Sequence, residues 1–210
     1  MSKKHLETIT CPDCGHTGDF PIWDSLNADL NPEAKDELIS GKLTRYVCGN
    51  CGNANEVAYS LLYHDMTGKL MVYMTAGRDS SEIESMPLGK MEGYSFRTVE
   101  SRNDLVEKIW IAGAGLDDRL VEVFKLLVRN QAGIAEEDVF LFGGVDKDDS
   151  LMFVIVKTEG NESLNVPRES FTETMAKLSA YVKFPDVKPG NWQRVDTAFA
   201  VKAFEEGGEG

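Results

Sequence analysis

Alternating apolar and polar positions predict several short β-strands in the first third of the chain. The predicted strands are residues 8–10, 19–23, 44–47, 56–62 and 69–75, and the alternation is clear in the last of them, at Leu70, Val72 and Met74. A helix is expected between the second and third of them, because Asn31 suits an N-cap, Pro32 suits the first helical turn and Gly41 suits a helix end. Residues 1–75 are therefore predicted to form a small β module with one inserted helix.

Residues 76–93 interrupt this pattern with Gly, Ser, Pro and charged residues, and we interpret them as a linker or mobile loop. Ser101 and Asp104 then form a capping-box pattern ahead of a helix that ends at Gly113. Further helices are expected at residues 116–130 and 167–182, and strands at residues 94–100, 139–142 and 151–156.

The end of the chain is less regular. Residues 192–204 fit a helix and a strand equally well, and residues 206–210 are expected to form a solvated tail. The predicted fold class is α+β, with residues 94–205 forming a larger acidic α+β domain behind the N-terminal module.

The net negative charge of the chain argues against two classes of partner. The 210 residues carry a net charge of −13, and both parts of the chain are acidic, with six basic against ten acidic residues in 1–75 and 16 against 25 in 76–210. Nucleic-acid binding relies on clustered Lys and Arg, but Lys3 and Lys4 form the only adjacent basic pair. The acidity argues against nucleic acid and against an anionic membrane surface as partners.

The N-terminal residues lack the apolar region of a signal peptide, and no window holds the roughly 18 apolar residues needed to span a bilayer. We therefore expect a cytoplasmic protein. Thiols stay reduced in that compartment and are available to metal ions.

All four cysteines lie in two C-x-x-C pairs, each followed by a glycine. Two residues between ligands let one tight turn aim both thiolates at the same ion, and the glycine permits the positive φ that turns the chain back. Four thiolates form a closed tetrahedral site for structural Zn²⁺. The sequence therefore predicts one zinc-ribbon-type site made of Cys11, Cys14, Cys48 and Cys51.

The spacing between the pairs is unusual. It amounts to 33 residues between Cys14 and Cys48, against roughly 15–20 in compact sites. The predicted helix between the pairs accounts for the excess, and a longer loop adds little closure entropy.

Other interpretations of the cysteines stay open, namely a thiol–disulfide redox site and an Fe–S cluster or another metal. A catalytic zinc would need an open fourth position, which four cysteines close. His16 could in principle replace a ligand, but with four thiolates present we interpret it as a surface residue or a neighbour of the site. His5 and His64 have no ligand-like spacing.

Several of these motifs resemble the CpXC domain family. The resemblance rests on Cys11-Pro-Asp-Cys14, on a second C-x-x-C after an inserted helix, and on the segments 61–65 and 115–119, and it covers about residues 7–125. The second pair departs from the family name, since Gly49 stands where a proline is expected. The resemblance implies a zinc-binding module and no particular reaction.

Other polar groups are weaker candidates. His64 and Asp65 precede a predicted turn, and Asp117, Asp118 and Arg119 open the most amphipathic helix, where carboxylates favourably meet the helix dipole. The acidic residues 146–149 lack the oxygen spacing of an EF-hand and suit a solvated turn. The glycines at 113, 115, 143 and 144 lack the sequence context of a phosphate-binding loop.

Three functions are compatible with this sequence. The first is an adaptor, in which a zinc-stabilised β module and an acidic domain bind another protein without catalysis. The second is a nucleic-acid-associated regulator, by analogy with other zinc ribbons. The third is an enzyme with a pocket between the domains, using His64, Asp65 or Arg119.

Overall fold

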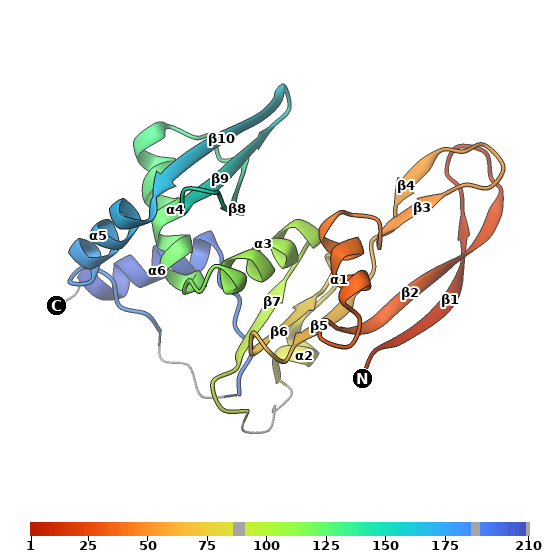
Figure 1. Ribbon diagram of the computed structural model, residues 1–210, viewed down its shortest axis with the longest axis horizontal. Coiled ribbons are helices and arrows are strands. Elements are labelled where there is room, and N and C mark those ends of the chain that lie inside the picture. The colour runs from red at the N-terminus through yellow and green to blue at the C-terminus, as the bar shows by residue number, and fades with distance from the viewer. Residues whose placement is uncertain (86–90, 186–189, 209–210) are drawn as a thin grey trace. The chain divides into compact units, whose positions relative to one another are not determined.

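The computed structural model describes residues 1–85, 91–185 and 190–208, drawn in colour in Figure 1. Over these residues the chain has mixed α+β architecture, with six helices and ten strands in three sheets. It divides into two compact units. The first comprises Met1–Val106 with Gly190–Trp192, and the second comprises Glu107–Pro189 with Gln193–Gly210.

The first unit is built on a five-stranded sheet of order β1-β2-β5-β6-β7. Neighbouring strands are antiparallel except for the pairs β2–β5 and β6–β7, which are parallel. Its elements are β1 (Lys3–Thr10), β2 (Thr17–Asn27), α1 (Pro32–Ile39), β3 (Arg45–Val47), β4 (Ala54–Glu56), β5 (Leu61–Asp65), β6 (Leu70–Met74), α2 (Ser81–Ser85) and β7 (Ser95–Val99).

The long connection from β2 to β5 contains α1 and a separate two-stranded hairpin, β3–β4. The helix follows the predicted signals, with Asn31 at the N-cap position and Pro32 as its first residue. The predicted strand at 56–62 is instead split, because β4 ends at Glu56 and β5 begins at Leu61. The two strands belong to different sheets, β4 to the two-stranded sheet and β5 to the five-stranded sheet.

The segment predicted as a linker, residues 76–93, contains α2, and its residues 86–90 lie outside the described part of the chain. The next strand, β7, pairs with β6 of the same unit, from Leu70 opposite Ser95 to Met74 opposite Val99. The division between the two units falls between Val106 and Glu107, within α3 (Arg102–Gly113). The boundary therefore lies inside a helix that follows the last strand of the sheet.

The second unit packs helices on one face of a three-stranded antiparallel sheet of order β10-β9-β8. Its elements after α3 are α4 (Asp118–Ala132), β8 (Val139–Val145), β9 (Ser150–Lys157), β10 (Gly160–Pro167), α5 (Arg168–Leu178) and α6 (Thr197–Gly208). The acidic residues 146–149 form the β8–β9 turn, as predicted, since Asp146 Oδ1 accepts hydrogen bonds from the N–H groups of Asp148 and Ser150.

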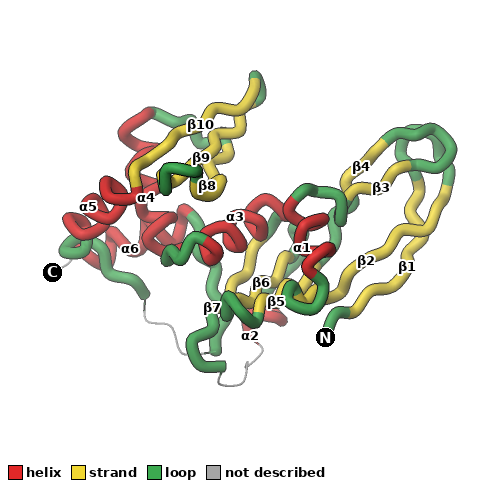
Figure 2. The backbone as a smooth tube through the Cα atoms, viewed as in Figure 1, coloured by secondary structure: helices red, strands yellow, loops and turns green. Residues whose placement is uncertain are grey.

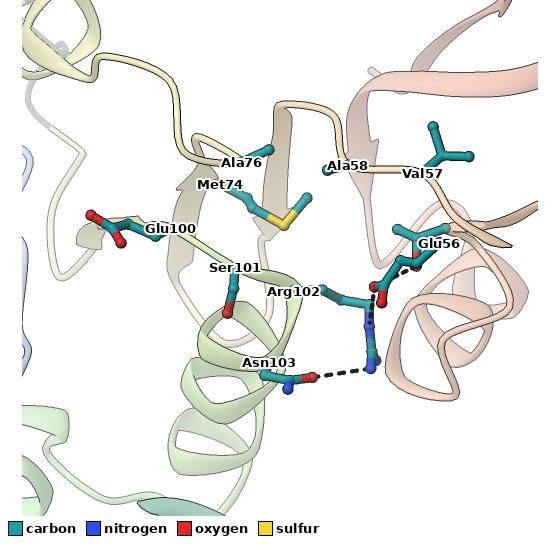
Figure 3. A pocket seen from close by; sticks show the side chains of 10 residues that line it. Glu56, Val57, Ala58, Met74, Ala76, Glu100, Ser101, Arg102 and Asn103 are labelled. Carbon is teal, nitrogen blue, oxygen red and sulfur yellow. Dashed lines mark hydrogen bonds and ion pairs between the residues drawn. The ribbon is translucent and has the colours of Figure 1, made fainter. Parts of the chain in front are cut away.

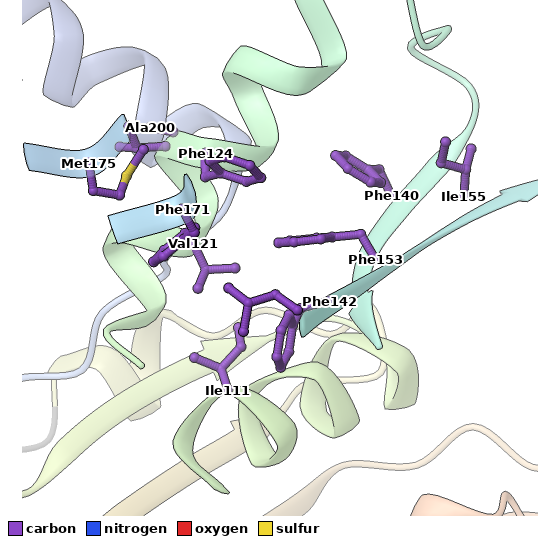
Figure 4. Close-up of a cluster of buried hydrophobic side chains, with 12 residues drawn as sticks. Ile111, Val121, Phe124, Phe140, Phe142, Phe153, Ile155, Phe171, Met175 and Ala200 are labelled. Atoms are coloured by element: carbon purple, nitrogen blue, oxygen red, sulfur yellow. The ribbon is translucent and has the colours of Figure 1, made fainter. Parts of the chain in front are cut away.

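Phenylalanine rings fill the core between this sheet and its helices (Figure 4). The Phe153 ring on β9 lies 5.4–5.6 Å, centroid to centroid, from Phe124 on α4 and from Phe140 and Phe142 on β8. Phe171 on α5 packs edge-on against Phe124 at 5.1 Å. These contacts join both layers of the second unit.

A buried ionic network lies in the same unit. Lys125 Nζ lies 2.8 Å from the carboxylates of both Glu107 and Glu122, and Glu107 accepts a hydrogen bond from the Phe142 N–H at 2.6 Å. Burial raises the pKa of Glu107, and the charge of Lys125 opposes that rise. Two charged residues of the amphipathic 116–130 helix, Glu122 and Lys125, are buried.

A second lysine extends the network. Lys108 Nζ donates to the Val195 carbonyl at 2.7 Å and lies 3.2 Å from Asp118 and 3.6 Å from Glu122. The network thus ties α3, α4, β8 and the segment before α6 together.

Two parts of the second unit differ from the sequence-based prediction. Strand β10 was not predicted, because only Leu164 and Val166 along it are apolar and partly buried. The ambiguous C-terminal segment is a helix, α6, which buries Ala200 and Ala203 and continues to Gly208, three residues into the predicted tail. Residues 209–210 of that tail lie outside the described residues.

Gly207 provides a test of how α6 packs. A Cβ atom at Gly207 would lie 2.6 Å from the Tyr181 carbonyl carbon and 2.9 Å from the Val182 nitrogen, so backbone would have to shift. We expect Gly207→Ala to destabilise the packed end of α6 by about 1–3 kcal/mol, measured by amide hydrogen exchange in α6. Gly208→Ala is the matched control, because a Cβ there meets nothing within 4 Å. Equal protection in both variants would contradict the close packing.

No helix among the described residues has both the length and the apolar character needed to cross a membrane.

Candidate metal centre

The four cysteines lie in two turns at the ends of two hairpins. Cys11 and Cys14 lie in the turn between β1 and β2, and Cys48 and Cys51 lie in the turn between β3 and β4. In Figure 2 the two turns lie side by side at the far ends of these strands. The two C-x-x-C motifs therefore meet although 33 residues separate them in the sequence.

The sulfur atoms of all four cysteines lie within 4.8 Å of one another. Across the two turns, Cys11 Sγ is 3.7 Å from Cys51 Sγ, and Cys14 Sγ is 3.6 Å from Cys48 Sγ. A tetrahedron with Zn–S bonds of about 2.3 Å has edges of about 3.8 Å. The cluster therefore has the size of a tetrahedral thiolate site, and its donor set suits a metal ion.

The two turns repeat the same backbone arrangement around their sulfur atoms. In the first turn the N–H groups of Asp13 and Cys14 face Cys11 Sγ, and in the second turn those of Asn50 and Cys51 face Cys48 Sγ. Gly15 and Gly52, which close the turns, have φ of 72° and 75°, in the left-handed region that favours glycine. The glycines predicted to turn the chain back do so.

These N–H groups stabilise negative charge on sulfur, which is the form that binds a metal. The pKa of Cys48 falls to about 6, because the N–H groups of Cys51 and Asn50 donate to its sulfur. The N–H of His16 and the side chain of Asn50 lower the pKa of Cys14 in the same way. Burial raises the pKa of Cys11.

Side chains also connect the two turns. Asn50 Nδ2 donates to Cys14 Sγ at 3.6 Å, and Asn55 Nδ2 donates to Asp13 Oδ2 at 3.2 Å. The sequence analysis did not single out either asparagine. The position of Asn50 between Cys48 and Cys51 is the one signal that could have suggested its contact with sulfur, whereas Asn55 contacts Asp13.

None of the three histidines joins the cysteine cluster. His16 takes part through its backbone, because its N–H faces Cys14 Sγ and its carbonyl accepts the Cys11 N–H at 2.8 Å. His5 is exposed and lies 3.3 Å from Asp24. His64 on β5 lies 3.2 Å from the Tyr94 hydroxyl.

His64 and Asp65 have separate structural partners. Asp65 accepts a hydrogen bond from the Gly68 N–H at 2.6 Å, in the turn between β5 and β6, and lies 3.2 Å from Lys35 Nζ. This agrees with the prediction that His64 and Asp65 precede a turn.

We expect His64 to make the first unit less stable in acid. Burial lowers the pKa of His64 below its usual 6.5, and the charged N-terminal amino group lowers it further. The unfolded chain therefore takes up this proton at higher pH than the folded chain, so stability falls as the pH drops below 6.5. Urea unfolding above and below pH 6.5 should show a smaller loss for His64→Gln than for the wild type.

His5→Gln is the control for that measurement, because His5 is exposed. If His64→Gln and His5→Gln both lost as much stability as the wild type on acidification, the acid sensitivity of the first unit would not come from His64.

Asp117, Asp118 and Arg119 are explained by the start of α4. Asp117 is the N-cap and accepts a hydrogen bond from the Arg119 N–H at 3.0 Å, and the Arg119 guanidinium returns to the same carboxylate at 2.9 Å. Arg119 also covers the Phe184 ring at 4.9 Å, and Asp118 lies 3.2 Å from Lys108. All of these partners belong to the second unit.

The glycines considered for a phosphate loop have structural positions. Gly143 and Gly144 lie at an irregularity of the β8–β9 register, and a Cβ at Gly143 would approach Val154 to 2.9 Å. Gly113 and Gly115 lie at the end of α3, where Gly115 has a φ of 67°.

A pocket of about 270 Å³ lies in the first unit near the start of α3 (Figure 3). Its most prominent cation, Arg102, is already engaged: it lies 3.4 Å from Glu56, donates to the Leu38 and Ile39 carbonyls at the end of α1, and donates to Asn103. The guanidinium thus satisfies the last carbonyls of a helix, which is a structural role. His64 and Asp65 do not line this pocket, and neither they nor Arg119 line a second pocket between α4 and α6.

Among protein families, the chain matches one described as CpXC protein, over residues 9–125. This range is more than half of the chain and includes both cysteine turns. Comparison with curated proteins gave no match, and comparison with solved structures gave none either.

Proposed function

This chain belongs to the CpXC protein family, and on that premise we propose that it binds one structural Zn²⁺ ion and acts as a non-catalytic adaptor for another protein. The ligands would be Cys11, Cys14, Cys48 and Cys51. The observation that carries the proposal is the closed cluster of four sulfur atoms at the meeting point of two hairpins.

The donor set supports zinc. Four thiolates in tetrahedral arrangement are typical of structural zinc sites, and the cross-turn sulfur separations of 3.6 and 3.7 Å suit zinc–sulfur bond lengths. Reduced thiols are required, which agrees with the cytoplasmic location expected from the sequence. An Fe–S cluster would use the same donors, so metal analysis decides between the two.

A structural role follows from the coordination number. A catalytic zinc keeps one position for water or substrate, whereas four protein thiolates leave none. The β3–β4 hairpin has only three residues in each strand, too few to be stable alone. Zinc binding would supply the folding energy that so small a hairpin lacks.

The adaptor role rests on exposed apolar side chains on the two hairpins that the metal would hold in place. Val47, immediately before Cys48, is 57% exposed, and Leu6 on the edge strand β1 is 68% exposed. Apolar side chains displayed on a metal-fixed hairpin suit contact with a protein. The net charge of −13 makes nucleic acid a poor partner.

The test is metal analysis combined with native mass spectrometry of the purified protein. One zinc per chain, lost on chelation together with protection of the β3–β4 amides, is the expected result. Iron, a disulfide between cysteines or no metal at all would contradict the zinc site.

The adaptor role needs its own experiment. Partners captured by the wild-type protein should be lost with Val47→Asp at unchanged zinc content. Retained capture, or salt-sensitive binding to DNA or RNA, would argue against the role.

A further inference from the structure

Tyr46 is the buried residue next to the metal centre that lacks an evident partner. It lies in β3, two positions before Cys48, and is 5% exposed. Its hydroxyl oxygen is buried and has no hydrogen-bond partner among the described residues. A buried hydroxyl without a partner costs stability, and phenylalanine would fill the same space without that cost. The hydroxyl therefore needs an explanation.

The orientation of the ring points to the metal centre. The Tyr46 ring packs edge-on against Phe20 of β2, with centroids 6.0 Å apart, while its hydroxyl lies over Gly18, where a Cβ would come within 2.7 Å of the oxygen. Gly18 pairs with Ile9, one step from the Thr10–Thr17 pair that closes the β1–β2 hairpin at the first cysteine turn. The hydroxyl end of Tyr46 is therefore directed toward that turn.

The Cys48 thiol lies on the same side of the chain as this hydroxyl. In extended chain, residues two positions apart point to the same side. Tyr46 and Cys48, the residue that follows β3, are both buried, whereas Val47 between them is 57% exposed, so the two buried side chains share one side of the chain. A buried phenolic O–H without a partner in the described part of the chain, on the same side as a thiolate ligand, is an available donor.

We propose that Tyr46 is a positioning residue of the metal centre, whose O–H donates a hydrogen bond to the Cys48 thiolate when the metal is bound. The proposal rests on the proposed function, because it requires metal binding by the four cysteines. Ligand atoms of metal sites commonly receive such hydrogen bonds, which orient the ligand and reduce the charge that it carries. Gly18 contributes by leaving room for the hydroxyl.

The matched variants are Tyr46→Phe and Tyr59→Phe. Tyr59 is equally buried in the same unit, but its hydroxyl donates to the Leu43 carbonyl at 3.3 Å. Each variant removes one buried hydroxyl. Only Tyr46→Phe should weaken Zn²⁺ binding, by about tenfold in a chelator competition, whereas Tyr59→Phe should lower stability with and without metal.

Cobalt(II) substitution gives a readout that packing alone would not change. A hydrogen bond to a thiolate lowers the energy of the sulfur lone pairs, so its loss should shift the sulfur-to-cobalt charge-transfer band of Tyr46→Phe to longer wavelength. In the metal-free protein Tyr46→Phe should be as stable as the wild type or more so, because it removes a hydroxyl without a partner.

The outcomes separate the two proposals. If the wild type binds no zinc, the proposed function fails. If the wild type binds zinc while Tyr46→Phe shows the same affinity and the same cobalt spectrum, the role of Tyr46 is overturned and the zinc site stands. Should Tyr46→Phe not fold, Gly18→Ala is the second variant, since its Cβ would displace the hydroxyl. Unchanged zinc affinity in Gly18→Ala would then overturn the role of Tyr46.

Discussion

Cys48→Ser is expected to abolish stoichiometric zinc binding and to unfold the β3–β4 hairpin. Structural zinc sites contribute on the order of 10 kcal/mol of binding energy to folding, and the strands flanking Cys48 are three residues each. Loss of a ligand should weaken binding by more than the roughly 100-fold that loss of a neighbouring hydrogen bond costs. Metal content and amide exchange across residues 45–56 measure both effects.

Gly49→Ala is the matched control in the same turn, because a Cβ at Gly49 meets nothing within 4 Å. It should keep one zinc and the protection of the hairpin. The five-stranded sheet should remain protected at β5 and β6 in Cys48→Ser, since these strands are held by their own pairing and by buried side chains such as Leu61 and Val72. A Cys48→Ser protein with full zinc content and a protected hairpin would exclude Cys48 as a ligand.

Lys125→Met is expected to destabilise the second unit by about 3–5 kcal/mol, because it leaves buried carboxylates without their cation. Glu122 keeps Lys108 at 3.6 Å, whereas Glu107 loses its ion-pair partner and keeps the Phe142 N–H as a hydrogen-bond donor. Amide exchange in α4 and β8 reports on this unit without mixing in the unfolding of the other.

Two further variants sharpen this prediction. Lys157→Met removes a partly exposed lysine that lies 2.8 Å from the largely exposed Glu162, and it should have a much smaller effect. Glu107→Gln in the Lys125→Met background should recover part of the loss, because a neutral amide needs no counter-charge and still accepts the Phe142 N–H. Equal stability of Lys125→Met and Lys157→Met would show that the buried network contributes little.

Local signals predicted local structure well. Ser101 and Asp104 form the expected capping box, with the Ser101 N–H donating to Asp104 at 3.0 Å. The N-terminal signals of α1 placed its start at Pro32. The capping box succeeds because the Ser101 and Asp104 side chains satisfy N–H groups at the helix start. Asn31 makes no such side-chain hydrogen bond, so the start of α1 follows from Pro32, whose fixed φ suits the first helical turn.

Elements that depend on distant partners were harder to predict. Strand β10 has a polar sequence and forms because β9 offers a complete register from Gly160 opposite Lys157 to Pro167 opposite Ser150. The C-terminal segment forms helix α6, and its two small side chains Ala200 and Ala203, three positions apart, are buried. Neither outcome is visible without the neighbouring element.

The four cysteines show most clearly which features the sequence determines and which depend on the tertiary structure. Their type, their two-residue spacing and the glycines after them are sequence facts, and the chemistry of a turn makes each pair a two-thiolate unit wherever it lies. Membership of the CpXC family could also be seen in these motifs. Only the tertiary structure decided that Cys11 faces Cys51 and Cys14 faces Cys48, and that Tyr46 is buried beside them, because these contacts are made between hairpins far apart in the chain.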